Sequence, residues 1–466
     1  MRVLQRMLEH SLARPALWGL QLLAIAAMMW ATRNEIFGDH GSYLALAEGI
    51  LHGHYSHYWH LDTPVPDTFR TPGFPLYIAA VVSVFGSWKA IMGLHLALYL
   101  LAIHLMLRII ARFDPRPLAG NLALLFLLPL VNVPYYITQL SPEIPTLAAI
   151  TTVIYLLLRK DRLSWMDAVA LGLLYGFIFQ CRPIYLWLPP VIAIAAWWAK
   201  RQAFDRLGHL VALSLFAITL LPYGSWNKQR HGVFQITPLE GGGGVVHMGI
   251  WSGLIPGHQE HRYWSNFAGD EIVRFTPADS IAKNIAAYEA DWDAVMDSLA
   301  PYLTEEDSVM MASFDRGEGA VRTFNTRYTQ ERERLLKQHT IALALERPGY
   351  AMAYKSWSAL RLWVIGIQRD KFLEASAVGK VKLLYPTVMT LSILLLSAFF
   401  ITIAFRRKLL SLGATQPLWL HLLYFGLIHI PFVIQVRYTT PVRPAMVALL
   451  ALAVASVLFK KKGIEA

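Results

Sequence analysis

Two carboxylates lie beside long apolar runs of the sequence. A charge at such a position costs free energy, so it commonly has a function. Asp39 follows the first apolar run within FGDHGSYLALAEGILHG, and Glu143 opens the fourth within QLSPEIP. Two carboxylates that face each other across a cavity would deprotonate a hydroxyl group and orient it. The alternatives are a solvated loop acid for Asp39 and a helix-start acid, stabilised by the helix dipole, for Glu143.

Four arginines lie beside prolines at the ends of other apolar runs. They are Arg70 in FRTPGFP, Arg182 in QCRPIY, and Arg437 and Arg443 in QVRYTTPVRP. A guanidinium group binds phosphate through a planar fork of N–H donors. Taken singly, each arginine is also explained by a side chain that reaches toward lipid head groups. Taken together, they predict a cavity at the rim of a helical bundle that binds a phosphate or pyrophosphate lipid.

The composition of the chain indicates a membrane protein. Of its 466 residues 55% are hydrophobic and 16% are charged, and the mean hydropathy is +0.41, which excludes an ordinary soluble enzyme. Hydrocarbon offers no water to backbone amides, so apolar runs of about 17 to 25 residues are expected to form helices. We therefore expect an all-α, polytopic membrane protein. The single cysteine, Cys181, cannot form an intrachain disulfide.

Apolar length and flanking Lys and Arg residues predict about ten transmembrane helices. They cover residues 15–33, 88–111, 117–137, 142–158, 164–181, 185–199, 207–224, 382–405, 416–434 and 442–459. Basic clusters occur at every second connection, which places both termini in the cytoplasm. The same distribution explains the net charge of +11 without a nucleic-acid partner. The run 75–86 is too short to cross and is expected to form an interfacial or re-entrant helix on the outer side.

This topology divides the chain into three regions. Residues 1–224 form an N-terminal transmembrane module whose first outer loop, 34–87, contains Asp39 and Arg70. Residues 225–380 are polar and are expected to form a mostly helical cap on the outer face, and residues 381–466 supply the last transmembrane helices.

Metal and nucleotide sites are not favoured. Five histidines crowd the first outer loop, but their spacing in HGHYSHYWH matches no defined metal site, and the interleaved aromatic residues suit a membrane interface. The glycine run 241–244 lacks the strand and helix of a nucleotide-binding loop and is expected to form a flexible turn. We expect no cofactor, although a divalent metal remains an alternative.

The order of several motifs along the chain resembles that of the polytopic GT-C glycosyltransferases. The closest resemblance is to the bacterial branch related to protein O-mannosyltransferases and lipid A aminoarabinose transferases. It is carried by GDHGSYLALAEGILHG, FRTPGFPLYIAAVVSVFG, QLSPEIPTLAA, PYGSWNKQRHGVFQITPLEGGGGVV, ALERPGYAMAYKSWSALRLW and VRYTTPVRPAMVALLALA. The resemblance implies a GT-C fold in a bacterial inner membrane. It also implies transfer of a sugar from a polyprenyl-phosphate donor to a lipid, glycan or protein acceptor on the outer face, with inversion.

The resemblance implies a role for several residues. Asp39 matches the general base of the first loop, and Glu143 matches the second-loop acid. Arg70 matches the contact to the lipid phosphate, and Arg437 with Tyr438 matches an Arg-Tyr pair in the last motif.

Further site residues come from their neighbourhood in the sequence. Arg182 and Arg443 are added to the phosphate site from the topology. His40 and Tyr43 are expected to contact substrate. Relatives often carry a second acid where this chain has His40, so a paired-carboxylate metal site is doubtful.

Two other functions share this pattern. A lipid-linked-saccharide flippase would also recognise an anionic lipid through arginines, but such transporters commonly contain two related halves, which are not evident here. A polysaccharide ligase or polymerase would differ in its leaving group, a pyrophosphate-linked glycan.

Overall fold

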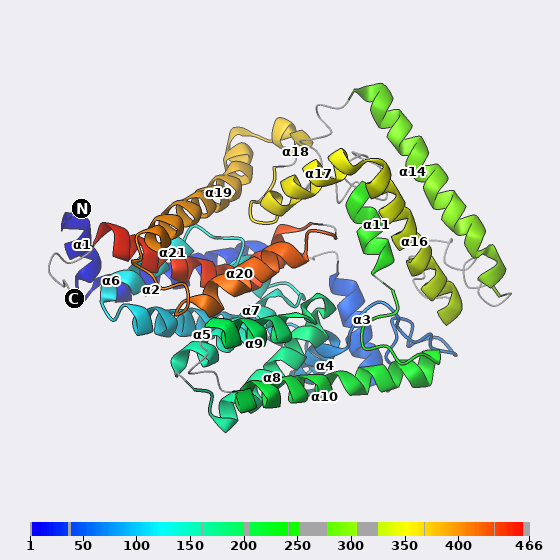
Figure 1. Ribbon diagram of the computed structural model, residues 1–466, viewed down its shortest axis with the longest axis horizontal. Coiled ribbons are helices and arrows are strands. Elements are labelled where there is room, and N and C mark those ends of the chain that lie inside the picture. Colours follow the sequence, from blue (N-terminus) through cyan, green and yellow to red (C-terminus); the bar gives the residue numbers. More distant parts are fainter. Residues whose placement is uncertain are drawn as a thin grey trace.

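The described part of the chain is entirely helical (Figure 1). The computed structural model describes residues 2–35, 39–160, 162–199, 206–240, 242–251, 277–304, 325–367, 369–432 and 434–459. Within these ranges the chain forms α-helices and short 3-10 helices and no strand. The expectation of an all-α fold is therefore confirmed.

The helices of the first half of the chain are α1 (Arg2–Glu9), α2 (Ala13–Thr32), α3 (His40–Leu51), α4 (Gly73–Phe85), α5 (Ala90–Phe113), α6 (Pro117–Leu127), η1 (Pro134–Ile137), α7 (Glu143–Arg159), α8 (Trp165–Cys181), η2 (Pro183–Tyr185), α9 (Leu188–Ala199) and α10 (Arg206–His231). Those of the second half are α11 (Gly243–Trp251), α14 (Ala278–Leu299), η3 (Ala300–Tyr302), α16 (Thr326–Glu346), α17 (Pro348–Arg361), α18 (Arg369–Glu374), α19 (Ala377–Arg406), α20 (Gln416–Ile428), η4 (Val436–Val442) and α21 (Arg443–Leu458).

Five helical segments among the described residues are long and apolar enough to cross a membrane. They are Ala13–Thr32, Ala90–Phe113, Arg206–His231, Ala377–Arg406 and Val436–Leu458. These segments are compatible with a multi-pass membrane protein. The other five expected spans fall on α6, α7, α8, α9 and α20, which have 11 to 17 residues. Helix length and composition therefore identify five candidate spans among the described residues, and they do not confirm the expected count of ten.

Proline accounts for part of this shortening. Pro129 follows the end of α6 by two residues, and the expected span 117–137 becomes a helix, a turn and the 3-10 helix η1. One expected span is longer than predicted, because α10 continues past residue 224 to His231 and carries the chain toward the polar region.

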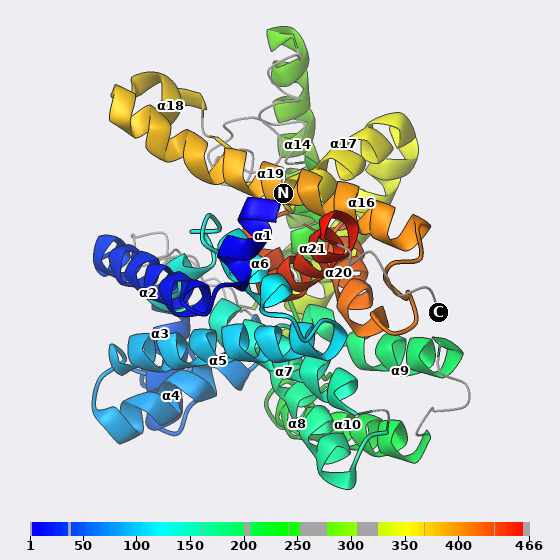
Figure 2. The same cartoon turned by 90° about the vertical axis from the view of Figure 1, so that its left-hand side faces the viewer.

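The core of the molecule is built around α21. This helix is buried along almost its whole length, and it packs on α5, α6, α19 and α20 (Figure 2). Its sequence alternates alanine with larger apolar residues, so that neighbouring backbones approach closely. The 3-10 helix η4 enters α21 and packs on α7, which brings the last motif of the sequence beside Glu143.

The segment predicted to be an interfacial helix forms α4, which packs on α3, α5 and α8. Its first residue, Gly73, lies directly against α8, where a Cβ atom would come within 2.6 Å of the backbone carbonyl of Gln180. Because only glycine fits there, the loop before α4 is held close to the end of α8. Arg70 and Arg182 are thereby brought to the same end of the helices.

Helices α11, α14, α16 and α17, which we call the cap helices, form a separate group (Figure 1). Helix α11 packs on α16, and α14 also packs on α16 through Tyr288, Val295 and Leu299. Residues 252–276 and 305–324 of the expected cap lie outside the described residues.

Candidate functional site

Asp39 links two arginines that are far apart in the sequence. It directly precedes α3, and its side chain makes no capping bond to that helix. Asp39 Oδ1 lies 2.9 Å from Arg70 Nη2, and Asp39 Oδ2 lies 2.9 Å from Arg437 Nη2. Each carboxylate oxygen therefore holds one arginine, the first from the loop before α4 and the second from η4.

Glu143 continues this row of charges. Its side chain is fully buried at the first position of α7, where the helix dipole favours an acid. Glu143 Oε1 forms an ion pair with Arg182 and lies 3.8 Å from Arg437 Nε. Arg70, Asp39, Arg437, Glu143 and Arg182, which we call the charge cluster, thus alternate in sign and carry a formal charge of +1.

The electrostatics of the charge cluster keep Asp39 ionised. Burial alone raises the pKa of the Asp39 carboxyl, but the charges of Arg70 and Arg437, and the hydrogen bonds that they donate, hold this pKa well below its ordinary value. A carboxylate of this kind accepts hydrogen bonds well and is a weak base while both arginines are bound to it.

Arg70 is also held by hydroxyl groups of α3. Its Nε donates to Ser42 Oγ at 3.0 Å, and its Nη1 donates to Tyr43 Oη at 2.9 Å. The guanidinium group lies over the Tyr43 ring, with 4.2 Å from Cζ to the ring centroid. These contacts orient one edge of the guanidinium group toward Asp39.

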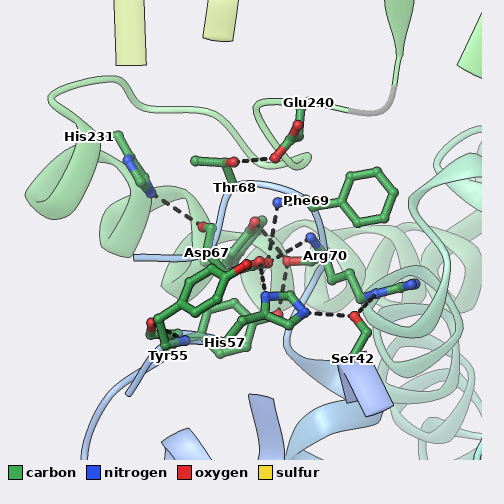
Figure 3. Close-up of polar contacts among 12 residues, drawn as sticks. Ser42, Tyr55, His57, Asp67, Thr68, Phe69, Arg70, His231 and Glu240 are labelled. Atoms are coloured by element: carbon green, nitrogen blue, oxygen red, sulfur yellow. Dashed lines mark hydrogen bonds and ion pairs between the residues drawn. The ribbon is translucent and has the colours of Figure 1, made fainter. Parts of the chain in front are cut away.

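Ser42 extends the contacts of Arg70 into a chain of hydrogen bonds (Figure 3). Ser42 Oγ lies 2.6 Å from His57 Nε2, and His57 Nδ1 lies 2.8 Å from Asp67 Oδ1. Because Arg70 can only donate and the Asp67 carboxylate can only accept, a neutral His57 carries its proton on Nδ1 and accepts the Ser42 proton on Nε2. Asp67 is buried, and its Oδ2 accepts the backbone N–H of Arg70 at 2.8 Å.

A cavity of about 470 Å³ lies beside the charge cluster. Its described lining residues are Tyr43, Phe69, Arg70, Thr71, Cys181, Arg182, Pro183, Ile184, Gln235, Thr237, Pro238, Leu239, Glu240, Gly242, Val245, Glu333, His429, Phe432 and Tyr438. Arg70 and Arg182 therefore reach the cavity, whereas Asp39, Glu143 and Arg437 are not among the described lining residues. A cavity of this size with convergent polar groups is typical of a small-molecule site.

Other predicted site residues have different positions. Tyr438 lines the cavity, and Arg182 lies over its ring at 4.9 Å. His40 is buried and packs edge-to-face on Trp88, with the ring centroids 4.7 Å apart. Burial lowers the pKa of the His40 imidazole.

Arg443 is not brought to the charge cluster. Its side chain is fully buried at the start of α21, where Nη2 donates to the Trp363 carbonyl oxygen at 2.8 Å. Its guanidinium group lies 5.4 Å from the Trp363 ring centroid. The phosphate contact expected for Arg443 is therefore not supported by its position.

The first-loop histidines and the glycine run also have specific partners. Within the described ranges, no three His, Cys, Asp or Glu side chains are placed to hold a metal ion. His52 stacks on Trp59. Gly243 and Gly244 begin α11, and their N–H groups donate to Glu333 Oε2, so the expectation of a flexible turn is wrong for these two residues.

Sequence reasoning missed Ser42, His57 and Asp67. A usable signal was present for Asp67, because an Asp three residues before Arg70 is typical of a side chain that accepts loop N–H groups. Ser42 and His57 carried no local signal, since their contact joins α3 to the loop that follows it.

Comparison with known proteins does not assign the chain: no family model, no curated protein and no solved structure matches it. The function is therefore inferred from the residues and their geometry.

Proposed function

We propose that this chain is an integral membrane glycosyltransferase of the GT-C type. It moves a sugar from a polyprenyl-phosphate donor to a lipid, glycan or protein acceptor. The observation that carries this proposal is the charge cluster, in which two carboxylates hold three arginines and two of those arginines, Arg70 and Arg182, line a cavity of about 470 Å³.

The cavity suits the phosphate of the donor. Arg70 and Arg182 present N–H donors that are already held by Asp39 and Glu143, so little reorganisation is needed when a phosphate binds. Ile184, Phe432 and other apolar residues of the lining offer a surface for the first units of the lipid tail. A donor with a charged head and a hydrocarbon tail explains why such a site lies among apolar helices.

The transfer requires no redox step. The acceptor oxygen attacks the anomeric carbon, the bond between that carbon and the phosphate oxygen breaks, and the electron pair leaves on the lipid phosphate. Attack from the face opposite the phosphate inverts the anomeric configuration. The acceptor proton passes to Asp39, and arginines stabilise the charge that develops on the leaving phosphate.

Donor binding prepares Asp39 for this role. The pKa of Asp39 is low because Arg70 and Arg437 face it. A donor phosphate that binds Arg70 weakens the electrostatic attraction between Arg70 and the Asp39 carboxylate. The proton affinity of Asp39 therefore rises once the donor is bound. Glu143 acts as a positioning residue in this scheme, because it is buried and holds Arg182 and Arg437.

The proposed topology completes this function. About ten helices, namely the five long candidate spans and the five shorter helices α6, α7, α8, α9 and α20, cross a bacterial inner membrane. Both termini are cytoplasmic, and the charge cluster and the cap helices lie on the periplasmic side. The alternation of basic clusters along the sequence supports this arrangement. No cofactor and no nucleic acid take part, and membrane lipids surround the spans.

The test is sugar transfer by the purified full-length protein in detergent from radiolabelled polyprenyl-phosphate sugars. Asp39→Asn should lower turnover by about 100-fold or more, since a general base contributes this much. Asp62→Asn, in an exposed position of the same loop, is the matched control and should retain native turnover.

Near-native turnover of the Asp39→Asn variant would remove Asp39 from the mechanism. Binding of the lipid by the native protein without turnover of any donor would favour the flippase instead.

A further inference from the structure

The lining of the cavity combines two kinds of polar groups. Arg70 and Arg182 can only donate hydrogen bonds. Gln235, Thr237, Glu240 and Glu333, which we call the acceptor wall, carry oxygen atoms that accept them. A ligand that fits both groups must offer acceptors to the arginines and hydrogen-bond donors to the acceptor wall.

Glu240 fixes the acceptor wall to the first loop. Its carboxylate Oε1 accepts from Thr68 Oγ1 at 2.6 Å, and its backbone N–H donates to the Thr68 carbonyl oxygen at 3.1 Å (Figure 3). Arg332 of α16 forms an ion pair with the other carboxylate oxygen. The loop before α4 and the cap helices are thus joined at the edge of the cavity.

Glu333 is held equally firmly. Its Oε2 accepts from the backbone N–H of Gly243 at 2.6 Å and from that of Gly244 at 3.2 Å, at the first turn of α11. Its Oε1 lies 3.4 Å from Arg332 Nη2. Two carboxylates share one arginine, so Arg332, Glu240 and Glu333 together carry a formal charge of −1, whereas the charge cluster carries +1.

His429 adds an acceptor that no described residue uses. Its side chain is 99% buried, lines the cavity and stacks on Tyr438 at 4.9 Å. Nδ1 lies 2.8 Å from the Phe425 carbonyl oxygen, so it must donate there. Nε2 is then an acceptor, and no described residue donates to it. Other buried polar atoms of the described residues also lack a partner, so Nε2 supports this inference only because His429 lines the cavity.

From this arrangement we propose that the cavity binds the donor in two parts and selects an uncharged sugar over a carboxylated one. Arg70 and Arg182 bind the phosphate, while the acceptor wall and His429 accept hydrogen bonds from sugar hydroxyl groups. A sugar acid would bring its carboxylate against Glu240 and Glu333. The selectivity, which rests on the proposed function, comes from this repulsion as much as from attraction of the hydroxyl groups.

Occupancy of the cavity is followed by the stability of the protein, because a ligand that binds only the folded state protects it from unfolding. The purified full-length protein in detergent is heated, and its melting temperature is followed by tryptophan fluorescence. Three probes are added in separate titrations: undecaprenyl phosphate, its neutral hexose derivative and its hexuronic acid derivative.

All three probes should protect the protein and raise its melting temperature. The hexose derivative should protect at about tenfold lower concentration than undecaprenyl phosphate, and the hexuronic acid derivative should show no such gain, since a like-charge contact offsets its hydroxyl contacts. Glu333→Gln should reduce the discrimination between the two sugars by about threefold, since Glu240 still repels the sugar acid, and it should leave protection by undecaprenyl phosphate unchanged. Glu331→Gln, two residues earlier on α16 and paired with Arg334, is the matched control.

Equal protection by both sugar lipids in the native protein, or an unchanged ratio in Glu333→Gln, would overturn this inference while leaving the proposed function intact. Absence of protection by undecaprenyl phosphate would instead refute the donor class, and the inference with it. If Glu333→Gln does not fold, Thr237→Val takes its place: it removes one acceptor of the lining, and it should reduce the gain from the hexose. An undiminished gain would count against the acceptor wall.

Discussion

Replacement of Glu143 by Gln should destabilise the protein far more than its small change in shape suggests. The Glu143 side chain is fully buried, and its carboxylate is the described ion-pair partner of Arg182. Glutamine keeps the size and one acceptor oxygen but removes the charge, so Arg182 is left as a buried cation. Breaking one side of a buried ion pair in this way costs about 3–5 kcal/mol.

The double variant Glu143→Gln/Arg182→Met separates charge from packing. Without Arg182 there is no uncompensated cation, so the two changes together should cost less than their sum, by about 1–3 kcal/mol. Unfolding in mixed micelles with increasing sodium dodecyl sulfate, followed by tryptophan fluorescence, measures both quantities. Glu331→Gln breaks an exposed ion pair with Arg334 and should change stability by less than about 1 kcal/mol.

Two results would refute this reasoning. A Glu143→Gln variant within about 1 kcal/mol of the native protein would mean that the Arg182 charge has another adequate partner or is solvated. Strict additivity in the double variant would mean that the two side chains stabilise the fold independently.

Three further predictions test neighbouring features. Ser42→Ala removes the acceptor of Arg70 Nε and should raise the donor KM by about tenfold with a smaller change in kcat, because a charged hydrogen bond contributes about 1.5–3 kcal/mol. Ser42→Thr should restore the affinity for the donor. A native KM for Ser42→Ala in the transfer assay would contradict the role of Ser42 in orienting Arg70. Burial lowers the pKa of Lys355 to about 7, whereas the unfolded chain keeps this proton up to a pKa near 10.5. Between these two pKa values the unfolded state binds more protons than the folded state, so the free energy of unfolding should rise from pH 7 to pH 9 by at most about 2–3 kcal/mol in unfolding titrations. An equal rise of this free energy with pH in Lys355→Met would exclude Lys355 as the cause. Gly243→Ala places a Cβ atom 2.0 Å from the Glu333 carbonyl oxygen, while Gly242→Ala meets no atom within 4 Å. The first should lower stability by about 1–3 kcal/mol and the second by much less in thermal unfolding, and similar melting temperatures would contradict the close approach of α11 and α16.

Local patterns in the sequence predicted the helices and several site residues. Each expected span overlaps a helix, and the short run 75–86 forms α4. This agreement follows because the spacing of apolar residues within about 20 consecutive residues indicates a helix that buries them. Helix length identifies five candidate spans where the sequence predicts about ten, since apolar content continues through prolines that end the helices, as at Pro129. Asp39 and Glu143 stood out because a charge beside an apolar run is conspicuous.

The partners of these residues were not evident from the sequence. Arg437 and Arg443 are only six residues apart and share a proline-rich motif, yet η4 directs one toward Asp39 and Glu143, and the other toward Trp363. Glu240 and Glu333 resembled any acids of a polar region until the fold placed both on one cavity.

Hydropathy is a property of a continuous segment, so the sequence alone determined that this chain is helical and suited to a membrane. An ion pair instead requires two side chains to come within about 4 Å. The charge cluster joins the residue before α3, the first residue of α7, the residue after α8, η4 and the loop before α4. Only the packing of α21 and η4 against α7, and of Gly73 against α8, decided which charges meet.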